Sequence, residues 1–296
     1  HNNVLKIPNA TMKCMTHYFC CMNKFLEDIF KGQTYDPSSF FLIAGPCVVE
    51  DEKIVAEIGA HVQSICERLA IPYILKASYR KANRTSAHSF TGLGDEKALA
   101  ILKAAGEKLK LPVTTDIHSA AEAAVAAQYV DVLQIPAFLC RQTDLLQAAA
   151  ATGKIVNVKK GQFLSGPSMK FAVEKIVETG NEKVMLTDRG NTFGYQDMVV
   201  DYRNITWMKA TGVPVIMDCT HSLQQPNQTS GVTGGNPALI STIARAAIAT
   251  GADGIFIETH PQPAKALSDG ANMLPLDKLE ILLTQLVALR KTVADW

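Results

Sequence analysis

The sequence predicts an α/β protein in which eight parallel strands close into a (β/α)8 TIM barrel. Eight short runs rich in β-branched and aromatic residues alternate with longer stretches of helical periodicity, as repeated strand–helix units do. The chain from Phe40 onward has about 250 residues, the usual size of such a barrel. No glycine-rich dinucleotide fingerprint follows any strand, which disfavours the alternative, an open doubly wound sheet.

The expected strands are the apolar runs that end in polar or turn-forming residues. The first, FFLIAG, is ended by Gly45-Pro46, and the last, GIFIET, is followed closely by Pro261. The expected strands cover 40–45, 73–78, 112–117, 132–137, 155–160, 183–188, 214–219 and 254–259. The expected helices between and after them cover 51–70, 95–110, 119–128, 143–152, 168–179, 236–250 and 276–293. Strands 1 and 8 must then be neighbours when the barrel closes.

The first part of the chain is expected to lie outside this pattern. We place residues 1–39 in an N-terminal extension that is partly disordered, and residues 40–296 in the catalytic barrel. Met22 begins a short helical stretch and is a candidate native start. The cysteines at 14, 20 and 21 and His17 have no zinc-finger spacing, so we do not assign a metal site to them.

Composition restricts the function classes. Hydrophobic residues make up 47% of the chain and charged residues 19%, values of a soluble globular protein. The net charge of +1 provides no global field for nucleic acid or a membrane surface, and no apolar run is long enough to span a bilayer. The seven cysteines lack paired regular spacing. We therefore expect reduced thiols, a cytoplasmic location, and no nucleic-acid or membrane partner.

Chemistry in such barrels takes place at the carboxyl ends of the strands, and here those ends are polar. Cys47 follows strand 1, His221 follows strand 7, Glu258 ends strand 8, and Asp269 comes after a short loop. Closure makes strands 7, 8 and 1 neighbours, so these four side chains can converge. A thiolate, an imidazole and two carboxylates suit a divalent Fe, Zn, Mn or Co ion. A Cys–His nucleophile pair is the other reading, but it leaves the carboxylates unexplained.

A second group at the strand ends is cationic: Lys76, Lys81, Arg84, Lys159 and Arg189. A lysine in a strand is costly to bury unless it is paired. Internal salt bridges to carboxylates at neighbouring strand ends would account for one or two of these cations. The whole set is more than one phosphate requires, so we expect two phosphorylated ligands, or a phosphate and a carboxylate.

Several ordered motifs resemble those of 3-deoxy-D-manno-octulosonate 8-phosphate synthase. They are IAGPC, LKASYRKANRTSAHSF, TTDIH, LQIPAFLCRQTDLL, NVKKGQF, DRGNTFGY, DCTHSLQQP and GIFIETHPQPAKALSDGANMLPL. The similarity extends from about Phe40 nearly to the C-terminus. The related 3-deoxy-D-arabino-heptulosonate 7-phosphate synthases, which use erythrose 4-phosphate, share the AGPC, metal and phosphate motifs. They typically have Lys-Pro-Arg where this chain has Lys81-Ala82-Asn83-Arg84, which favours the octulosonate enzyme.

The resemblance implies a transferase of lipopolysaccharide biosynthesis. It would condense phosphoenolpyruvate with D-arabinose 5-phosphate and water, releasing phosphate, as a homotetramer with sites near subunit interfaces. By motif, the residues that hold phosphoenolpyruvate would be Lys76, Lys81, Gln134, Ala137, Lys159 and Arg189. The sugar phosphate would be held by Asn83, Arg84 and Thr85. The candidate catalytic residues are Lys81, Asp116, His118 and His221, of which Asp116 and His118 are the candidates for proton transfer. The metal ligands would be Cys47, His221, Glu258 and Asp269, with cysteine after Gly-Pro marking the metal-dependent group.

One departure from the family pattern lies beside the sugar-phosphate motif. The family usually has Phe-Asp before Lys-Ala-Asn-Arg, and this chain has Tyr79-Arg80. Arg80 could shift the loop, contact a phosphate or face solvent. Two hypotheses of other classes also stay open. A lysine Schiff-base aldolase would use Lys76 or Lys159 and would be trapped by borohydride, whereas a sugar-phosphate-sensing paralogue would release no phosphate.

Overall fold

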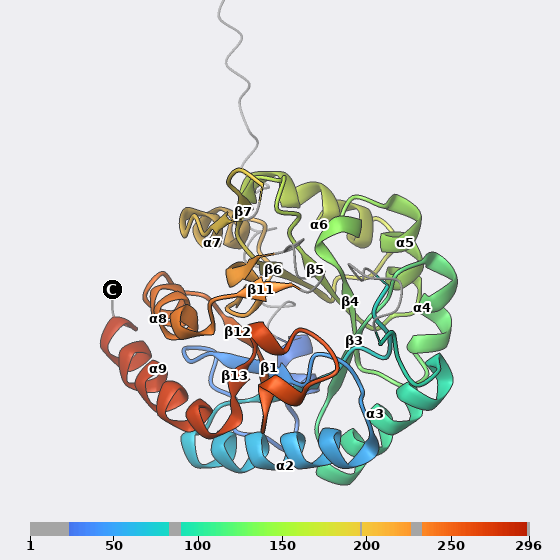
Figure 1. Cartoon of the computed structure of the whole chain (residues 1–296). Helices are drawn as coiled ribbons and strands as arrows, with labels where there is room; N and C mark the ends of the chain where they lie inside the picture. The colour runs from blue at the N-terminus through green and yellow to red at the C-terminus, as the bar shows by residue number, and fades with distance from the viewer. Residues whose placement is uncertain (1–23, 83–89, 196, 226–232, 295–296) are drawn as a thin grey trace, which may run out of the picture.

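The computed structural model describes residues 24–82, 90–195, 197–225 and 233–294. Within them, eight parallel strands form a closed barrel inside a ring of helices (Figure 1). In order around the barrel, the strands are β1 (Phe41–Gly45), β2 (Tyr73–Lys76), β3 (Val113–Asp116), β4 (Val132–Ile135), β5 (Ile155–Lys159), β6 (Val184–Asp188), β9 (Val215–Asp218) and β12 (Gly254–His260). The predicted (β/α)8 fold is confirmed.

The barrel closes because β12 pairs with β1 in parallel register. Phe41 is opposite Gly254, and Gly45 is opposite Glu258. This register brings Cys47, the residue after Gly45-Pro46, to the level of the last residues of β12. Strand 1 is buried along its whole length, as expected for a strand covered by side chains on one face and helices on the other.

Eight helices make the outer layer: α2 (Glu52–Leu69), α3 (Asp95–Leu109), α4 (Ala120–Ala126), α5 (Thr143–Ala151), α6 (Lys170–Val177), α7 (Arg203–Lys209), α8 (Ile240–Ala249) and α9 (Leu279–Val293). Local chemistry sets their ends. The carboxylate of Asp51, for example, accepts a hydrogen bond from the Ile54 N–H at 2.8 Å and caps the first turn of α2. None of the helices in the described residues is both long and apolar enough to cross a membrane.

Short elements at the carboxyl ends of the strands complete the rim. They are the hairpin of β7 (Asn191–Thr192) and β8 (Met198–Val199), the hairpin of β10 (Gln224–Gln225) and β11 (Gly234–Gly235), β13 (Leu274–Pro275), and the 3-10 turns η1 (Ala137–Leu139), η2 (Gly166–Met169), η3 (His221–Leu223), η4 (Pro237–Leu239), η5 (Pro263–Lys265), η6 (Gly270–Asn272) and η7 (Leu276–Lys278). The hairpins and α7 were not predicted from the sequence.

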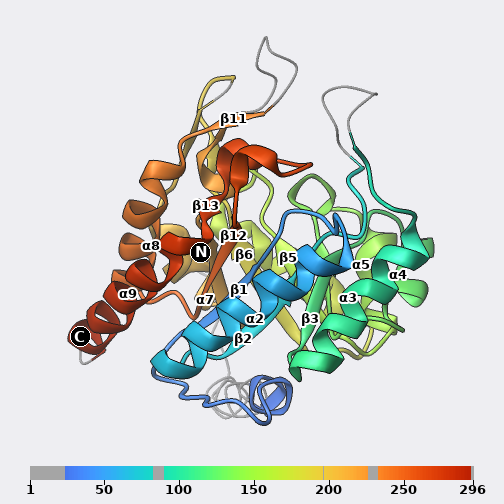
Figure 2. The same cartoon turned by 60° about the horizontal axis from the view of Figure 1, so that its bottom comes forward.

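The segment 24–39 packs against the barrel at the opposite end. Residues 24–29 are helical, and the side chains of Phe25, Leu26 and Phe30 are buried. The ring of Phe30 lies 5.5 Å from that of Phe41 at the start of β1. In Figure 2 this blue segment lies below the barrel, away from the rim that carries β11. The described part of the predicted extension therefore contributes to the core.

Candidate active site

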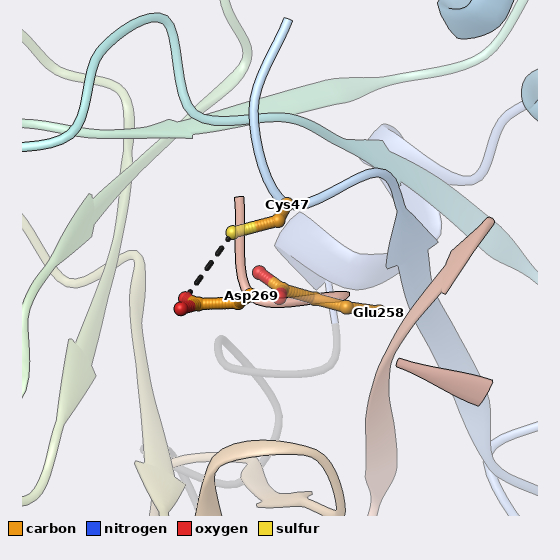
Figure 3. A group of neighbouring side chains, drawn as sticks. All are labelled: Cys47, Glu258 and Asp269. Carbon is orange, nitrogen blue, oxygen red and sulfur yellow. Dashed lines mark hydrogen bonds between the residues drawn. The ribbon is translucent and has the colours of Figure 1, made fainter. Parts of the chain in front are cut away.

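The carboxyl ends of β1 and β12 bring three predicted metal ligands together. Cys47 follows β1, Glu258 lies within β12, and Asp269 immediately precedes η6. One ligand atom from each of them lies within 4.8 Å of the others, and the three side chains converge on one point (Figure 3). Sγ of Cys47 is 3.4 Å from Oδ2 of Asp269. The backbone of Asp269 has a φ of +48°, an uncommon value for a residue with a side chain.

His221, the fourth predicted ligand, borders this group. Its Nε2 lies 3.6 Å from Oε2 of Glu258. Its Nδ1 lies 2.8 Å from Oδ2 of Asp218, the last residue of β9, and its backbone N–H donates to the same carboxylate. A carboxylate on Nδ1 orients an imidazole and directs its Nε2 outward, the arrangement that metal-bound histidines usually have. The ring therefore faces Glu258.

The donor set fits a divalent cation. Oε2 of Glu258 is buried and accepts no hydrogen bond from the residues that the structure describes, although a buried carboxylate oxygen normally has a partner. Burial raises the pKa of the Cys47 thiol well above its usual value, and the negative charge of Glu258 raises it further. A metal ion would reverse this effect, because a coordinated thiol is deprotonated. The site thus combines an unpartnered oxygen, a thiol that a cation would ionise and an oriented imidazole.

Two of the predicted cations are paired with buried carboxylates. Nζ of Lys76 donates to Oε1 of Glu258 at 2.5 Å and to the Cys47 carbonyl at 3.0 Å. Nζ of Lys159 donates to Oδ2 of Asp218 at 2.6 Å. Burial alone would raise the pKa of the Glu258 carboxyl, but the charges of Lys76 and His221 hold it below its usual value. Lys76 and Lys159 thus agree with the expectation that internal salt bridges account for one or two of the cations. Their partners are Glu258, a predicted metal ligand, and Asp218, which contacts His221.

Lys81 and Arg189 differ from these lysines, because neither forms an ion pair with a carboxylate of the described residues. Nζ of Lys81 donates to Oγ of Ser78 at 3.1 Å. Nη2 of Arg189 donates to the His221 carbonyl at 3.1 Å and to Oε1 of Gln224 at 2.9 Å, and its Nε is buried without a hydrogen-bond partner in the described part of the chain. Burial lowers the pKa of Arg189, which a bound anion would offset. These two side chains are the ones available to a phosphate.

A chain of polar side chains crosses the barrel next to the cations. Asp116 accepts hydrogen bonds from Oγ of Ser78 at 2.5 Å and from Nε2 of Gln134 at 2.7 Å. Oε1 of Gln134 in turn accepts from Nδ2 of Asn157 at 3.0 Å. Burial alone would raise the pKa of Asp116, but three lysines, Lys76 first, hold it below its usual value. Asp116 is therefore kept ionised.

The structure places the remaining predicted residues at different depths. Ala137 begins η1 after β4 and is buried. His118 lies just after β3, where its backbone N–H and its Nδ1 contact Oε2 of Glu122 at 2.8 and 3.2 Å. The predicted sugar-phosphate ligands Asn83, Arg84 and Thr85 lie outside the described residues.

Arg80, the departure from the family pattern, forms two ion pairs. Nη1 is 3.0 Å from Oδ2 of Asp95 at the start of α3, and Nη2 contacts Oε1 of Glu122 in α4. The guanidinium group is directed toward the helices, and its side chain is about one-third exposed, at 35%. The sequence raised three possibilities for Arg80, a shifted loop, a phosphate contact or exposure to solvent, and pairing with two carboxylates was not one of them.

Three residues with contacts at the site were not assigned a role from the sequence. Asp218 was recognised only as one polar strand end, and its pairing with His221 required the turn after β9. Oγ of Ser268 lies 3.1 Å from Sγ of Cys47. Glu122 gathers five polar contacts near His118. A serine beside Asp269 and a glutamate four residues after His118 are the only signals that the sequence offers for the last two.

Comparison with known proteins gives the family. The model of the DAHP synthetase I family matches residues 16–295. The chain belongs to this family.

Relatives within the family share about half of their residues with this chain. The 2-dehydro-3-deoxyphosphooctonate aldolase of Cyanothece sp. is 49% identical over 259 residues, which cover 88% of this chain and 95% of the relative. The protein of the same name from Trichlorobacter lovleyi is 51% identical over 252 residues, covering 85% and 93%. That from Desulfosudis oleivorans is 49% identical over 255 residues, covering 86% and 91%. The predicted resemblance to the octulosonate enzymes is confirmed.

Proposed function

We propose that this chain catalyses the condensation of phosphoenolpyruvate with D-arabinose 5-phosphate and water to give 3-deoxy-D-manno-octulosonate 8-phosphate and phosphate. The relatives reported above are named for a phosphorylated octonate, which favours an eight-carbon product over the seven-carbon product of erythrose 4-phosphate. The observation that carries the proposal is the convergence of Cys47, Glu258 and Asp269 beside Lys81 and Arg189, which form no ion pair with a carboxylate of the described residues.

A divalent metal is part of this proposal. Cys47, His221, Glu258 and Asp269 would hold it, and when bound it would supply a Lewis acid for an aldehyde oxygen or a site for an ordered water. Fe, Zn, Mn and Co all suit a ligand set of one sulfur, one nitrogen and two oxygens. The unpartnered Oε2 of Glu258 and the aligned Nε2 of His221 support this assignment.

The cations would bind and orient the two phosphorylated substrates. Lys81 and Arg189 would contact phosphoenolpyruvate directly, whereas Lys76 and Lys159 add positive potential from their paired positions. Arg84 and Thr85 would bind the phosphate of the sugar, and Asn83 would bind the sugar itself. Gln134 and Ala137 would line the phosphoenolpyruvate site from β4 and η1.

The reaction requires one carbon–carbon bond, one water addition and one phosphate departure. The methylene carbon of phosphoenolpyruvate attacks the aldehyde carbon, and the aldehyde oxygen takes up a proton. Water adds to the central carbon and loses one proton, which balances the proton taken up by the aldehyde oxygen. The bond from that carbon to the phosphate oxygen then breaks as the new hydroxyl becomes a carbonyl, and its proton leaves with the phosphate. His118 and Asp116 are the proposed residues for proton transfer; the lowered pKa of Asp116 makes this carboxylate a weak base, so His118 is the stronger candidate to carry the proton.

Phosphate release tests the substrate and the metal together. We expect release with phosphoenolpyruvate and arabinose 5-phosphate, at a kcat/KM far above that with erythrose 4-phosphate. Strong chelation should abolish release, and Mn(II) or another divalent ion should restore it. Comparable kcat/KM for the two sugars would contradict the octulosonate assignment. Full activity in rigorously metal-free protein, or in Cys47→Ala, would contradict the metal site. Borohydride trapping with substrate would instead identify a Schiff-base lysine.

We also propose that the chain self-associates through its rim, as a homotetramer. Large apolar side chains are exposed in the loops after β4, β5 and β6, namely Phe138, Phe163, Phe193 and Tyr195. The β5 and β6 loops are joined, since the Thr192 N–H donates to the Gln162 carbonyl at 3.0 Å. Exposed aromatic groups of this kind are typical of subunit contacts. The surface borders the candidate site, so a second copy would lie next to it.

Mass measurement and subunit mixing test this surface. Analytical ultracentrifugation should give four times the chain mass for the wild type, and a smaller species for Phe163→Asp combined with Phe193→Asp. If Arg84 serves a neighbour's site, mixing inactive Arg84→Ala with inactive Cys47→Ala should regenerate activity. A monomer at micromolar concentration would overturn the self-association. Exchange of tagged subunits without recovered activity would overturn the shared site.

A further inference from the structure

The carboxylate of Glu122, in the first turn of α4, connects the ends of two neighbouring strands. Oε2 accepts a hydrogen bond from the Tyr79 hydroxyl and from the backbone N–H of His118, at 2.8 Å in the second case. Oε1 accepts from Nη2 of Arg80 and from Oγ of Ser119, the latter at 2.9 Å. Burial alone would raise the pKa of Glu122, but the hydrogen bonds from Tyr79, His118 and Ser119 hold it below its usual value. The group is a fixed carboxylate between the segments that follow β2 and β3.

Arg80 extends this connection to a third element. Its Nη1 donates to Oδ2 of Asp95 at 3.0 Å, in the first turn of α3. The fork of the guanidinium thus joins α3 to α4, and the Tyr79 ring lies 5.6 Å from its central carbon. Both terminal nitrogens of Arg80 are occupied by carboxylates, which leaves no free fork for a phosphate.

Arg80 directly precedes Lys81 in the chain, and the backbone of both residues pairs with residues 91–92. Arg80 forms an antiparallel bridge with Gly92, and the Lys81 N–H donates to the Thr91 carbonyl at 2.8 Å. The approach is close, because a Cβ on Gly92 would lie 2.9 Å from the Tyr79 carbonyl. Lys81 then reaches Oγ of Ser78, which donates to Asp116. The orientation of Lys81 therefore depends on the residue that Glu122 and Asp95 hold.

We propose that Glu122 and Arg80 form a clamp of positioning residues that holds Lys81 and His118 in register for the condensation. Glu122 contacts His118 directly, and it acts on Lys81 through Arg80. Neither clamp residue touches the reacting atoms. The inference rests on the proposed function for its kinetic effect, but the clamp itself is a property of the chain. It also explains the charge change at position 80, since an aspartate there would face two carboxylates.

A double-mutant cycle with a matched control tests the clamp. Arg80→Ala and Glu122→Ala should each lower kcat/KM for both substrates by about ten- to a hundredfold, because misplaced groups lose catalysis steeply. The double variant should be no worse than the poorer single variant, since one unit is lost in each case. The control pair is Arg68 and Glu280, which joins α2 to α9 at 2.7 Å away from the site. Arg68→Ala and Glu280→Ala should change kcat/KM by less than about twofold.

Hydrogen exchange at the Lys81 amide provides a readout that does not need activity. This N–H should exchange faster in Arg80→Ala and Glu122→Ala than in wild type and in Arg68→Ala. Arg80→Lys should give an intermediate exchange rate. If wild type released no phosphate, the proposed function would fail while this measurement still tested the clamp.

Three outcomes would overturn the proposal. The first is losses that add in the double variant. The second is a rise in KM for arabinose 5-phosphate alone in Arg80→Ala without any effect in Glu122→Ala, which would make Arg80 a direct ligand. The third is wild-type exchange at Lys81 in both single variants.

Discussion

Sγ of Cys47 lies 3.1 Å from Oγ of Ser268, and both side chains are buried. Once the thiol loses its proton, the serine hydroxyl is the donor of this contact. A donor to a metal-bound ligand usually matters, because its loss costs about 10–100-fold in metal affinity. We therefore expect Ser268→Ala to weaken metal binding by about tenfold or more. Competition with a chromophoric chelator measures the affinity, and the thiolate-to-Co(II) absorption band should shift.

Ser222 offers a matched control for this prediction. It is buried like Ser268, at 2% against 3%, but its hydroxyl has no hydrogen-bond partner. Ser222→Ala should bind Co(II) as tightly as wild type does, and Ser268→Thr should retain most of the affinity. Equal affinities for Ser268→Ala and wild type would show that the hydroxyl does not act on the thiolate.

At the scale of single residues, the sequence predicted the metal ligands themselves better than the residues that hydrogen-bond to site residues. Cys47, Glu258 and Asp269 could be grouped because barrel closure alone makes their strands neighbours. Ser268 and Glu122 could not, because their hydrogen bonds depend on the path of a loop and on side-chain rotamers. The sequence could not predict which groups Arg80 contacts, for the same reason. A guanidinium reaches about the same distance toward a phosphate, toward solvent or toward a helix, and only the packing of α3 and α4 decides among them.

At the scale of elements, the end of β1 approaches β2 so closely that only glycine fits between them. An added Cβ on Gly45 would lie 2.0 Å from the Lys76 carbonyl oxygen, and the φ of Gly45 is +156°. We expect Gly45→Ala to force the two strands apart, and hence to displace both Cys47 and Lys76. The variant should lose most of its metal affinity and unfold at a clearly lower Tm, by the equivalent of about 3 kcal/mol or more.

Gly153→Ala is a control that separates the cost of backbone strain at a positive φ from the cost of the steric clash with the Lys76 carbonyl. Gly153 also has a positive φ, of +70°, but a Cβ there would meet nothing within 4 Å. This variant should show only the strain of a left-handed residue, about 1–2 kcal/mol, with normal metal binding. If Gly45→Ala behaved like Gly153→Ala, the close approach of β1 to β2 would not control the site.

Elements with one buried periodic face were predictable, and small ones were not. All eight barrel strands lie within the expected ranges or extend one residue beyond them, because each is a short run rich in β-branched and other apolar residues with a sharp end. Helix α7 was missed, since its seven residues, RNITWMK, include three β-branched or aromatic side chains and show little periodicity. The two-residue strands of the β7–β8 hairpin carry no signal of their own.

At the scale of the whole molecule, the segment 24–39 contributes to stability from the end opposite the site. Phe30 is 1% exposed and packs between the rings of Tyr35 and Phe41, with centroids 5.4 and 5.5 Å away. Truncating a buried phenylalanine costs about 3–5 kcal/mol. We expect Phe30→Ala to lower the free energy of unfolding by about this amount, measured by urea denaturation, with the metal affinity of the folded protein unchanged.

Ile281→Ala is the comparison for this change, since Ile281 in α9 is 65% exposed. Its free energy of unfolding should stay within about 0.5 kcal/mol of the wild-type value. A Phe30→Ala protein as stable as Ile281→Ala would mean that the segment is not part of the cooperative core. A change in metal affinity would instead connect this end of the barrel to the site.

Because β1 pairs with β12, the site cannot assemble until the last strand of the barrel has been synthesised. Cys47 and Asp269 are separated by 222 residues in the chain. At ordinary translation speeds of about 5–20 residues per second, Cys47 leaves the ribosome roughly 10–45 seconds before Asp269. Throughout that interval the first strand has an unpaired edge, which is a hazard for misassembly with other nascent chains. The cysteine cannot acquire its carboxylate neighbours until nearly all of the barrel has been made, so metal uptake at this position would report that translation and closure are complete.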